Sequence, residues 1–233
     1  MFYVPEQDVT YRIGRFMHAV YGFMAVALSL SAVVAYYISS SSALVNKIFN
    51  SPQSSIILIG LLVVQVVLVI GITAAIRTIS FATALALFFL YAGLLGVTLS
   101  SIFLVYEIGS IYQTFFISAA MFGGMSLYGY FTNADLTSLG NILIMIFWGM
   151  FASLLINMWF KSDQLDMIIS FVGVIIFALL TAYDTQKIKL ISQQMMLDDE
   201  DMSKIAVLGA LTLYLDFINI FLFLLRFLGD RKK

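Results

Sequence analysis

Residues 210–229 read ALTLYLDFINIFLFLLRFLG, an apolar run of membrane-spanning length that contains the carboxylate Asp216. Eleven uncharged residues precede Asp216 directly and nine follow it. An ionised carboxylate at the bilayer centre costs on the order of 3 kcal/mol even on lenient insertion scales. A helix that keeps such a residue has to shield it within protein or water, and ionisable residues in this position are functional candidates by default.

The composition of the whole chain indicates a membrane protein. Of its 233 residues, 62% are hydrophobic and 11% are charged, and the mean hydropathy is +1.02. Soluble domains carry about 25% charged residues. The apolar runs are long and continuous, which predicts an all-α polytopic membrane protein and not a barrel of short alternating strands. The formal net charge of −1 gives no argument for binding nucleic acid.

Charged residues divide the chain into long uncharged runs. A helix needs about 20 residues to cross a ~30 Å hydrocarbon core. We therefore predict seven transmembrane helices in a single domain, residues 1–233, in which residues 1–18 form a short N-terminal tail. The uncharged runs that carry this prediction are 19–46, 48–76, 78–106, 108–134, 136–160 and 167–183, and the last is the segment 205–225, which is uncharged apart from Asp216.

Of the ionisable residues within or at the ends of these runs, four are candidates for chemistry: Arg77, Asp184, Asp216 and Arg226. Counting spans places Arg77 and Asp184 on the side of the membrane where the last helix begins. Two carboxylates in contact cannot both ionise cheaply and take up a shared proton, so this trio is a candidate proton sensor. The structural alternative places Asp184 in the interface, satisfies Asp216 with neighbouring hydroxyls or amides, and lets Arg77 snorkel to water. For Arg226, snorkelling is the better interpretation.

The remaining polar candidates carry little chemistry. Gln65, in the second run, either lines a polar path through the membrane or bonds to another helix. The chain has no cysteine, and it shows no nucleophile–base pattern, no Gly-rich phosphate loop and no H-E-x-x-H motif. The two aspartates stand in AYDTQ and YLDFI, which lack the glycine-flanked signature of intramembrane aspartyl proteases. We therefore predict no enzymatic activity and no bound cofactor.

Two segments near the C-terminus resemble the Bax inhibitor-1 family, also called the transmembrane Bax-inhibitor-motif proteins: GVIIFALLTAYDTQKIK (173–189) and LGALTLYLDFINIFLFLLRFLG (208–229). The likeness is to the bacterial inner-membrane members and covers nearly the whole chain. It implies seven helices with the last one central, and a pH-sensitive calcium leak gated by two aspartates, which match Asp184 and Asp216. The family's latch arginine matches Arg77. Gln65 stands nearest to a glutamate that a calcium-leaking member carries in its second helix.

Three functions are consistent with these residues. The first is a pH-sensitive calcium leak channel of the bacterial inner membrane, in which Asp184 and Asp216 bind the permeating ion weakly and transiently. The second is an interaction protein that regulates an inner-membrane quality-control protease or a stress response without ion flux. The third is a proton-coupled cation exchanger that uses the same aspartates as carriers. Buried carboxylates are hard to justify in a pure scaffold, which favours flux. The expected partners are the lipid bilayer, calcium ions, and a membrane protease or other membrane protein.

Overall fold

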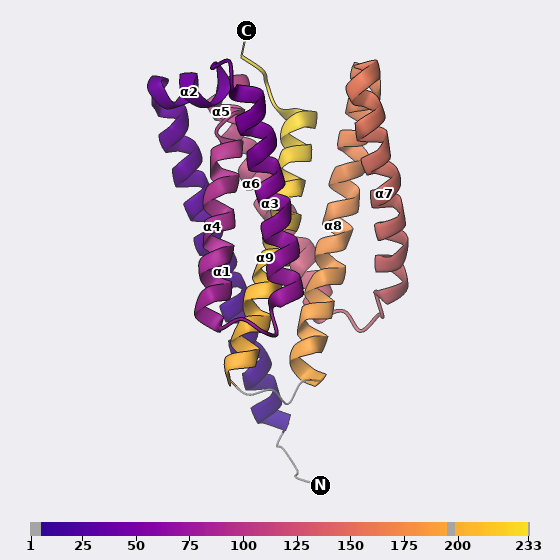
Figure 1. Cartoon of the computed structure of the whole chain (residues 1–233). Coiled ribbons are helices and arrows are strands. Elements are labelled where there is room, and N and C mark those ends of the chain that lie inside the picture. Colours follow the sequence, from indigo (N-terminus) through magenta and orange to yellow (C-terminus); the bar gives the residue numbers. More distant parts are fainter. Residues whose placement is uncertain (1–5, 195–198, 233) are drawn as a thin grey trace. The chain divides into compact units, whose positions relative to one another are not determined.

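The computed structural model describes residues 6–194 and 199–232, with side chains for residues 11–193 and 200–232. Over these residues the chain is all-helical, as predicted, and contains no strands apart from one isolated bridge between Tyr106 and Arg231 (Figure 1). The helices are α1 (Glu6–Ser40), α2 (Ser42–Phe49), α3 (Ser54–Ala75), α4 (Phe81–Leu99), α5 (Ile102–Val105), α6 (Ile108–Phe131), α7 (Thr137–Phe160), α8 (Asp163–Gln194) and α9 (Asp199–Leu228).

Six helical segments in the described residues are long and apolar enough to cross a membrane. The run 108–134, expected to form a further span, contains α6, which has 24 residues but is less apolar than the six. Three of its buried residues carry hydroxyl groups: Thr114, Ser118 and Ser126. The six candidate spans are Tyr11–Ser40, Ser54–Ala75, Phe81–Val105, Thr137–Phe160, Asp163–Gln193 and Glu200–Leu228.

The N-terminal segment differs from the short tail expected for residues 1–18. Residues 1–5 lie outside the described residues, and α1 already begins at Glu6. The buried positions Ile13, Phe16, Met17 and Val20 explain the early start. They recur at spacings of three and four residues, so the segment presents one apolar stripe and is stabilised as a helix by burying it.

By its internal contacts the chain divides into two compact units. The first contains Met1–Val105 and Ser192–Leu211, and the second contains Tyr106–Ile191 and Thr212–Lys233. Helix α9 is continuous and contributes residues 199–211 to the first unit and 212–228 to the second. The single-domain organisation expected from the sequence stays a prediction.

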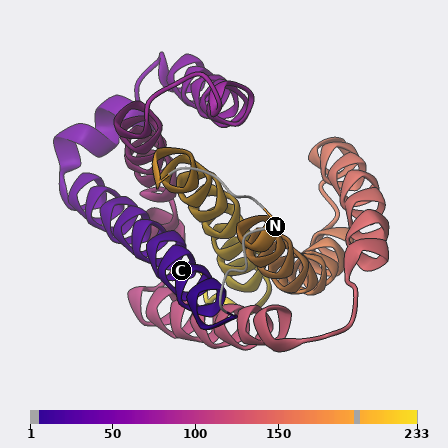
Figure 2. The same ribbon diagram turned by 90° about the horizontal axis from the view of Figure 1, so that it is seen from below.

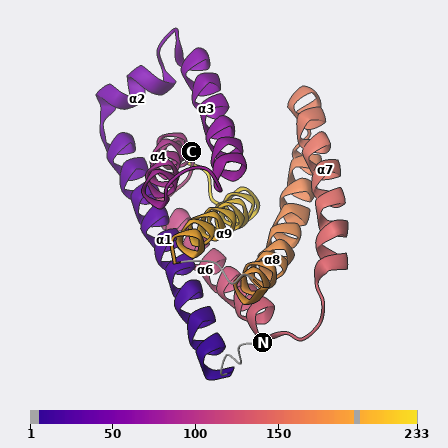
Figure 3. The same ribbon diagram turned by 60° about the horizontal axis from the view of Figure 1, so that its bottom comes forward.

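In the first unit α4 packs along α1, and α2 links α1 to α3 (Figure 3). Small residues allow the two long helices to approach closely. Ala27, Ser31 and Ala35, spaced four residues apart on α1, are all buried. The Ser31 hydroxyl donates to the Ala92 carbonyl of α4 at 2.7 Å. A Cβ added at Gly96 would lie 2.7 Å from the Ser31 carbonyl oxygen, so only glycine fits there. Such small-residue contacts are the usual basis of helix packing in lipid.

In the second unit α7 and α8 lie side by side, as the end view in Figure 2 shows. Gly140 of α7 faces the Tyr183 ring of α8, which would be 2.5 Å from a Cβ at that position. On another side of α8, Gly129 of α6 lies against the Ala182 carbonyl, which leaves no room for a side chain at position 129. Glycine therefore sets the spacing of α8 from both α6 and α7.

The end of α9 is attached to its own unit by polar contacts. Arg226, expected to snorkel, instead forms an ion pair with Asp166 at the start of α8, at 3.2 Å. The Glu107 N–H donates to the Asp230 carbonyl, and the Asp230 N–H donates to Ser110 Oγ, both at 2.9 Å. Because Asp166 stands in the first turn of α8, an aspartate–arginine pair links the beginning of one helix to the last turn of the other.

Substitution of Gly96 tests the small-residue contact in the first unit. Gly96→Ala would place its Cβ 2.7 Å from the Ser31 carbonyl oxygen and 2.8 Å from Val34 Cβ. Overpacking of this kind costs about 1–3 kcal/mol, so we expect a lower unfolding midpoint in detergent micelles. Gly93→Ala on the same helix meets no atom within 4 Å and is the matched control. We expect the control to be neutral or slightly stabilising, because alanine favours helix over glycine; equal destabilisation of both variants would contradict the packing argument.

Candidate functional site

The candidate site is formed where α8 and α9 of the second unit bring Asp184 and Asp216 together. Both helices are longer than their uncharged runs: α8 continues to Gln194 and α9 begins at Asp199. Each aspartate therefore lies inside a helix and not at a helix end. The side chains of the two aspartates interact directly with each other.

The closeness of the two carboxyl groups limits how the pair can be protonated. Two carboxylates in contact cannot both ionise cheaply, because like charges repel and burial disfavours the charged form. Asp216 is 5% exposed, and its Oδ2 atom has no hydrogen-bond partner. Asp184 is part-buried. In its singly protonated form the pair carries one negative charge, and in acid it becomes neutral.

Hydroxyl groups and a glycine contact surround this position on α8. Thr185 Oγ1 and Ser126 Oγ of α6 hydrogen-bond at 3.0 Å, and both residues are buried. One helical turn further on α6, Gly129 contacts the backbone of Ala182. The segment of α8 that carries Asp184 is therefore held against α6 by backbone contact and by a bond between side chains.

The next residues of α8 hold the connection between α6 and α7. The Gln186 side chain accepts from the Leu136 N–H at 2.9 Å and donates to the Ala134 carbonyl at 2.7 Å. Lys189 donates to the Tyr130 carbonyl at 2.7 Å, and its Nζ lies 4.9 Å from the centre of the Tyr130 ring. These contacts fix the α6–α7 connection beside the aspartate-bearing turn of α8.

One exposed carboxylate in this connection has a perturbed titration. Asp135 accepts from the Thr137 side chain and from the Thr137 N–H, the latter at 2.9 Å. These hydrogen bonds favour the charged form and lower the pKa of Asp135 below its ordinary value. These hydrogen bonds stabilise the fold fully at a pH above the unfolded-state pKa of Asp135. This stabilisation is lost as the pH falls through the folded-state pKa of Asp135.

The cation that the structure places beside the pair is Lys187, which the sequence analysis did not single out. It follows Asp184 by three residues on α8, and the two groups interact electrostatically. Its Nζ lies 5.6 Å from the centre of the Tyr183 ring. Residues three apart are neighbours on a helix surface, so the spacing in DTQK was the signal that could have identified it.

Arg77 and Gln65 belong to the first unit. Arg77 is exposed in the turn after α3, and its assignment as the latch stays a prediction. Gln65 is 8% exposed, and its amide donates to the Leu94 carbonyl at 3.0 Å and to Thr98 Oγ1 at 2.7 Å. Of the two roles considered for Gln65, the structure therefore shows bonding to another helix, α4; a pore-lining role stays a prediction.

The donor set at the pair is small. Within the side chains that the structure describes, no three His, Cys, Asp or Glu residues gather where they could hold a metal ion. Two carboxyl groups can bind and release a proton, and in the ionised state they can attract a cation.

Comparison with known proteins identifies the family. Residues 13–233 match the family model described as Inhibitor of apoptosis-promoting Bax1. Inner membrane protein YbhL of Escherichia coli is 47% identical over 218 residues, which cover 93% of this chain and 92% of YbhL. The chain belongs to the Bax inhibitor-1 family. This confirms the resemblance inferred from residues 173–189 and 208–229.

Other relatives extend the same comparison. An uncharacterised protein of Borreliella burgdorferi is 47% identical over 219 residues, covering 94% of this chain and 93% of the relative. A membrane protein of Streptococcus pyogenes is 34% identical over 219 residues, covering 93% of each chain. Together with the six apolar helices, these relatives place the protein in the bacterial inner membrane as a multi-pass member of the Bax inhibitor-1 family.

Removing the Gln186 side chain tests its role in the α6–α7 connection. Gln186→Ala leaves the Leu136 N–H and the Ala134 carbonyl without their side-chain partner. An unsatisfied buried group costs about 1–3 kcal/mol, so we expect lower stability and faster hydrogen exchange at Leu136. Gln193→Ala, at an exposed position near the end of α8, is the control and should change neither. Unchanged exchange at Leu136 in Gln186→Ala would contradict the anchoring role.

Proposed function

We propose that this Bax inhibitor-1 family protein is a pH-sensitive calcium leak channel and not an enzyme. The observation that carries the proposal is the interacting pair of Asp184 and Asp216 on two candidate membrane-spanning helices. Burying a carboxyl group away from water without full hydrogen bonding costs free energy. Asp216 is nevertheless buried, and its Oδ2 atom has no hydrogen-bond partner. A titrating gate gives a reason to retain it that a packing role does not.

The proposed channel has seven spans, with α6 as the additional one. Its 24 residues give about 36 Å of helix, which is enough to cross the hydrocarbon core. Large apolar side chains on α6 are exposed, among them Phe116, Leu127 and Phe131, while Thr114, Ser118 and Ser126 are buried. This is the pattern of a lipid-facing helix with a polar inner face.

The last helix is proposed to be the central one. In the candidate span Glu200–Leu228, 72% of the most apolar window is buried, against 11% in Ser54–Ala75 and 17% in Thr137–Phe160. A helix that must keep a carboxyl group away from lipid is expected to have the most protein around it. The burial of α9 supports its central place.

Calcium is proposed to pass the aspartate pair without binding tightly. Calcium prefers six to eight oxygen ligands, and two carboxyl groups supply at most four oxygen atoms. The hydroxyls of Thr185 and Ser126, near in sequence and space to Asp184, already bond to each other. Occupancy of Asp184 and Asp216 by calcium is therefore expected to be weak and transient, with calcium as the transported ion and not as a structural one.

Gating follows from the charge of the pair. Near neutral pH the pair holds one proton and one negative charge, which a cation can hold in the closed state. Acidification neutralises the remaining carboxylate, removes its attraction for the cation and opens the path. Family resemblance assigns the latch to Arg77, and Lys187 lies beside Asp184 as a second cation.

Asp184→Asn is the first test of this gate, measured as calcium flux into proteoliposomes across pH. The variant imitates the neutral, acid form, so it should leak at neutral pH near the acid-activated level of the unmodified protein and lose most of its pH response. Asp216→Asn should also flatten the response, because it removes the other titrating group. Asp163→Asn, an exposed carboxylate at the start of α8, is the control. If Asp184→Asn stays closed and pH-responsive, the gate is wrong; if no preparation shows flux, the regulatory alternative is favoured.

The two cations are distinguished in the same assay. Lys187→Gln removes a positive charge that favours the ionised pair, so protonation becomes easier and the pH of half-maximal flux should move upward. Arg77→Ala should raise the basal leak at neutral pH and keep part of the titration, because the pair is still present. Lys161→Gln, an exposed lysine after α7, is the control for lost charge. A normal basal leak in Arg77→Ala would remove Arg77 from the latch.

A further inference from the structure

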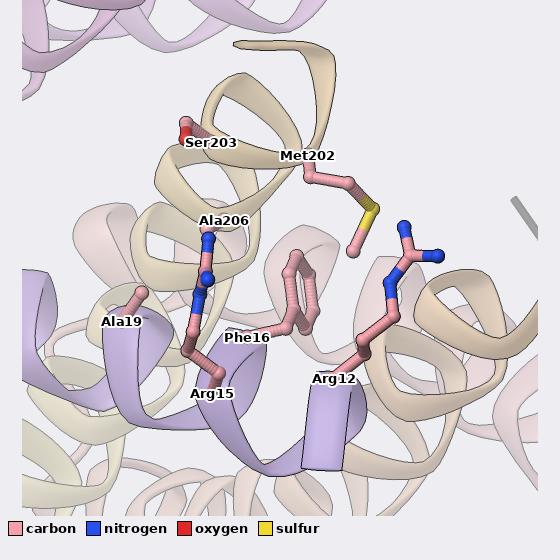
Figure 4. A pocket seen from close by; sticks show the side chains of 7 residues that line it. All are labelled: Arg12, Arg15, Phe16, Ala19, Met202, Ser203 and Ala206. Atoms are coloured by element: carbon pink, nitrogen blue, oxygen red, sulfur yellow. The ribbon is translucent and has the colours of Figure 1, made fainter. Parts of the chain in front are cut away.

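A closed leak needs a barrier on the route that an ion takes past the aspartate pair. The first unit contains a pocket of about 280 Å³ between the beginnings of α1 and α9, where Arg12, Phe16 and Met202 are among the lining residues (Figure 4). Neither Asp184 nor Asp216 lines this pocket. The barrier is therefore expected in the second unit, beside the pair itself.

The line of contacts between α8 and α9, which we call the seam, continues from the aspartates to two phenylalanine rings. Phe177 precedes Asp184 by seven residues, and Phe223 follows Asp216 by seven. Seven residues are close to two helical turns, or about 10 Å, so each ring lies on the same face of its helix as the aspartate. The two rings stack with their centroids 5.8 Å apart, and both side chains are buried.

Phe223 packs against the backbone of α8. A Cβ added at Gly173 would lie 2.7 Å from the Phe223 ring, so the ring occupies the space that a side chain would need. Phe177, which stacks on Phe223, also meets the Phe147 ring of α7 edge-to-face at 5.8 Å. At this level the seam is therefore filled by aromatic rings, which offer no oxygen atom to a cation.

Beyond the rings the seam becomes polar again. Asp166 precedes Asp184 by 18 residues, or about five turns, and so lies on the same face of α8. Its ion pair with Arg226 of α9 closes the far end of the seam, and both side chains are part-exposed. The contacts along one line thus run from acidic through apolar to charged. An apolar constriction between polar segments is a known way to close a pore, because it excludes water.

We propose that the Phe177–Phe223 pair, packed on Gly173, is the apolar barrier that closes the seam to water and ions between the aspartates and the Asp166–Arg226 end. This inference rests on the proposed function, because it names the point at which the leak is closed. A cation that leaves the aspartates in this direction has to pass two rings that cannot replace its hydration water.

The first test is calcium flux into proteoliposomes that contain the full-length protein. Phe223→Ala should raise the leak at neutral pH at least fivefold and keep a pH response, because both aspartates remain. Phe221→Ala is the matched control: it removes another buried ring from α9, but one that meets Phe115 of α6 at 6.3 Å. The control should stay within twofold of the unmodified protein. An unchanged leak in Phe223→Ala, or equal leaks in the two variants, would overturn the proposal.

A second pair of variants separates the apolar character of position 223 from its size. Leucine and asparagine side chains have nearly the same shape, but only the asparagine amide bonds to water. Phe223→Leu should therefore stay closed at neutral pH, whereas Phe223→Asn should leak. Equal leaks in these two variants would contradict a barrier that works by excluding water.

Access to the seam can also be measured without ion flux. The chain has no cysteine, so Thr181→Cys introduces a single thiol at a buried position of α8 between Phe177 and Asp184. Its rate of modification by a charged thiol reagent should rise at least tenfold when Phe223→Ala is added and stay unchanged with Phe221→Ala. If no preparation shows flux but access rises in this way, the barrier stands and the calcium leak fails. If access does not rise, the barrier is overturned.

Discussion

The meeting of the Asp184 and Asp216 carboxyl groups is the constraint on which the arrangement of α8 and α9 in the second unit depends. A charge in lipid is so costly that α9 can carry Asp216 only where protein encloses it. Two carboxylates in contact cannot both ionise cheaply, which favours one negative charge at the pair over two. The pair also requires that α8 and α9 approach each other closely. Gly173 of α8 permits a similar approach at another level, where a Cβ would lie 2.7 Å from the Phe223 ring.

Close backbone approach is the second requirement, and glycine provides it in both units. Lipid tails are as apolar as leucine, so helices in a membrane gain little from burying apolar surface and depend on tight packing and on bonds between helices. Gly96 meets the backbone of Ser31 in the first unit, and Gly129 meets the backbone of Ala182 in the second. Each contact is accompanied by a serine hydroxyl bonded across the same pair of helices: Ser31 to Ala92, and Ser126 to Thr185. The same physical solution therefore recurs at two places that share no sequence.

Charge-free runs were sufficient to predict the helices, because a membrane imposes length and polarity more strictly than water does. The run 108–134 correctly predicted a helix at α6, but its status as a span stays a prediction, because the buried Thr114, Ser118 and Ser126 lower its hydropathy. The beginning of α1 was missed because Arg12 and Arg15 interrupt the run, although the spacing of Ile13, Phe16, Met17 and Val20 indicated a helix. The sequence already indicated Asp184 and Asp216 as a candidate pair, and α8 and α9 extend far enough beyond the uncharged runs to place each aspartate inside a helix. The Arg226–Asp166 pair could not be predicted, because it depends on which ends of two helices are neighbours.

A leak and a tight binding site make opposite demands on the same carboxyl groups. Conduction needs an ion to be attracted strongly enough to enter and held weakly enough to leave. Two carboxyl groups that share a proton offer one negative charge and few oxygen atoms, which is far from the six to eight ligands of a calcium-binding loop. A third acidic group at the pair would strengthen binding and slow release. Gln65 of the first unit adds no charge that could strengthen cation binding. Its uncharged amide donates to Leu94 and Thr98 of α4. The sparse donor set is therefore an argument for the proposed leak, since a richer one would turn a passing ion into a bound one.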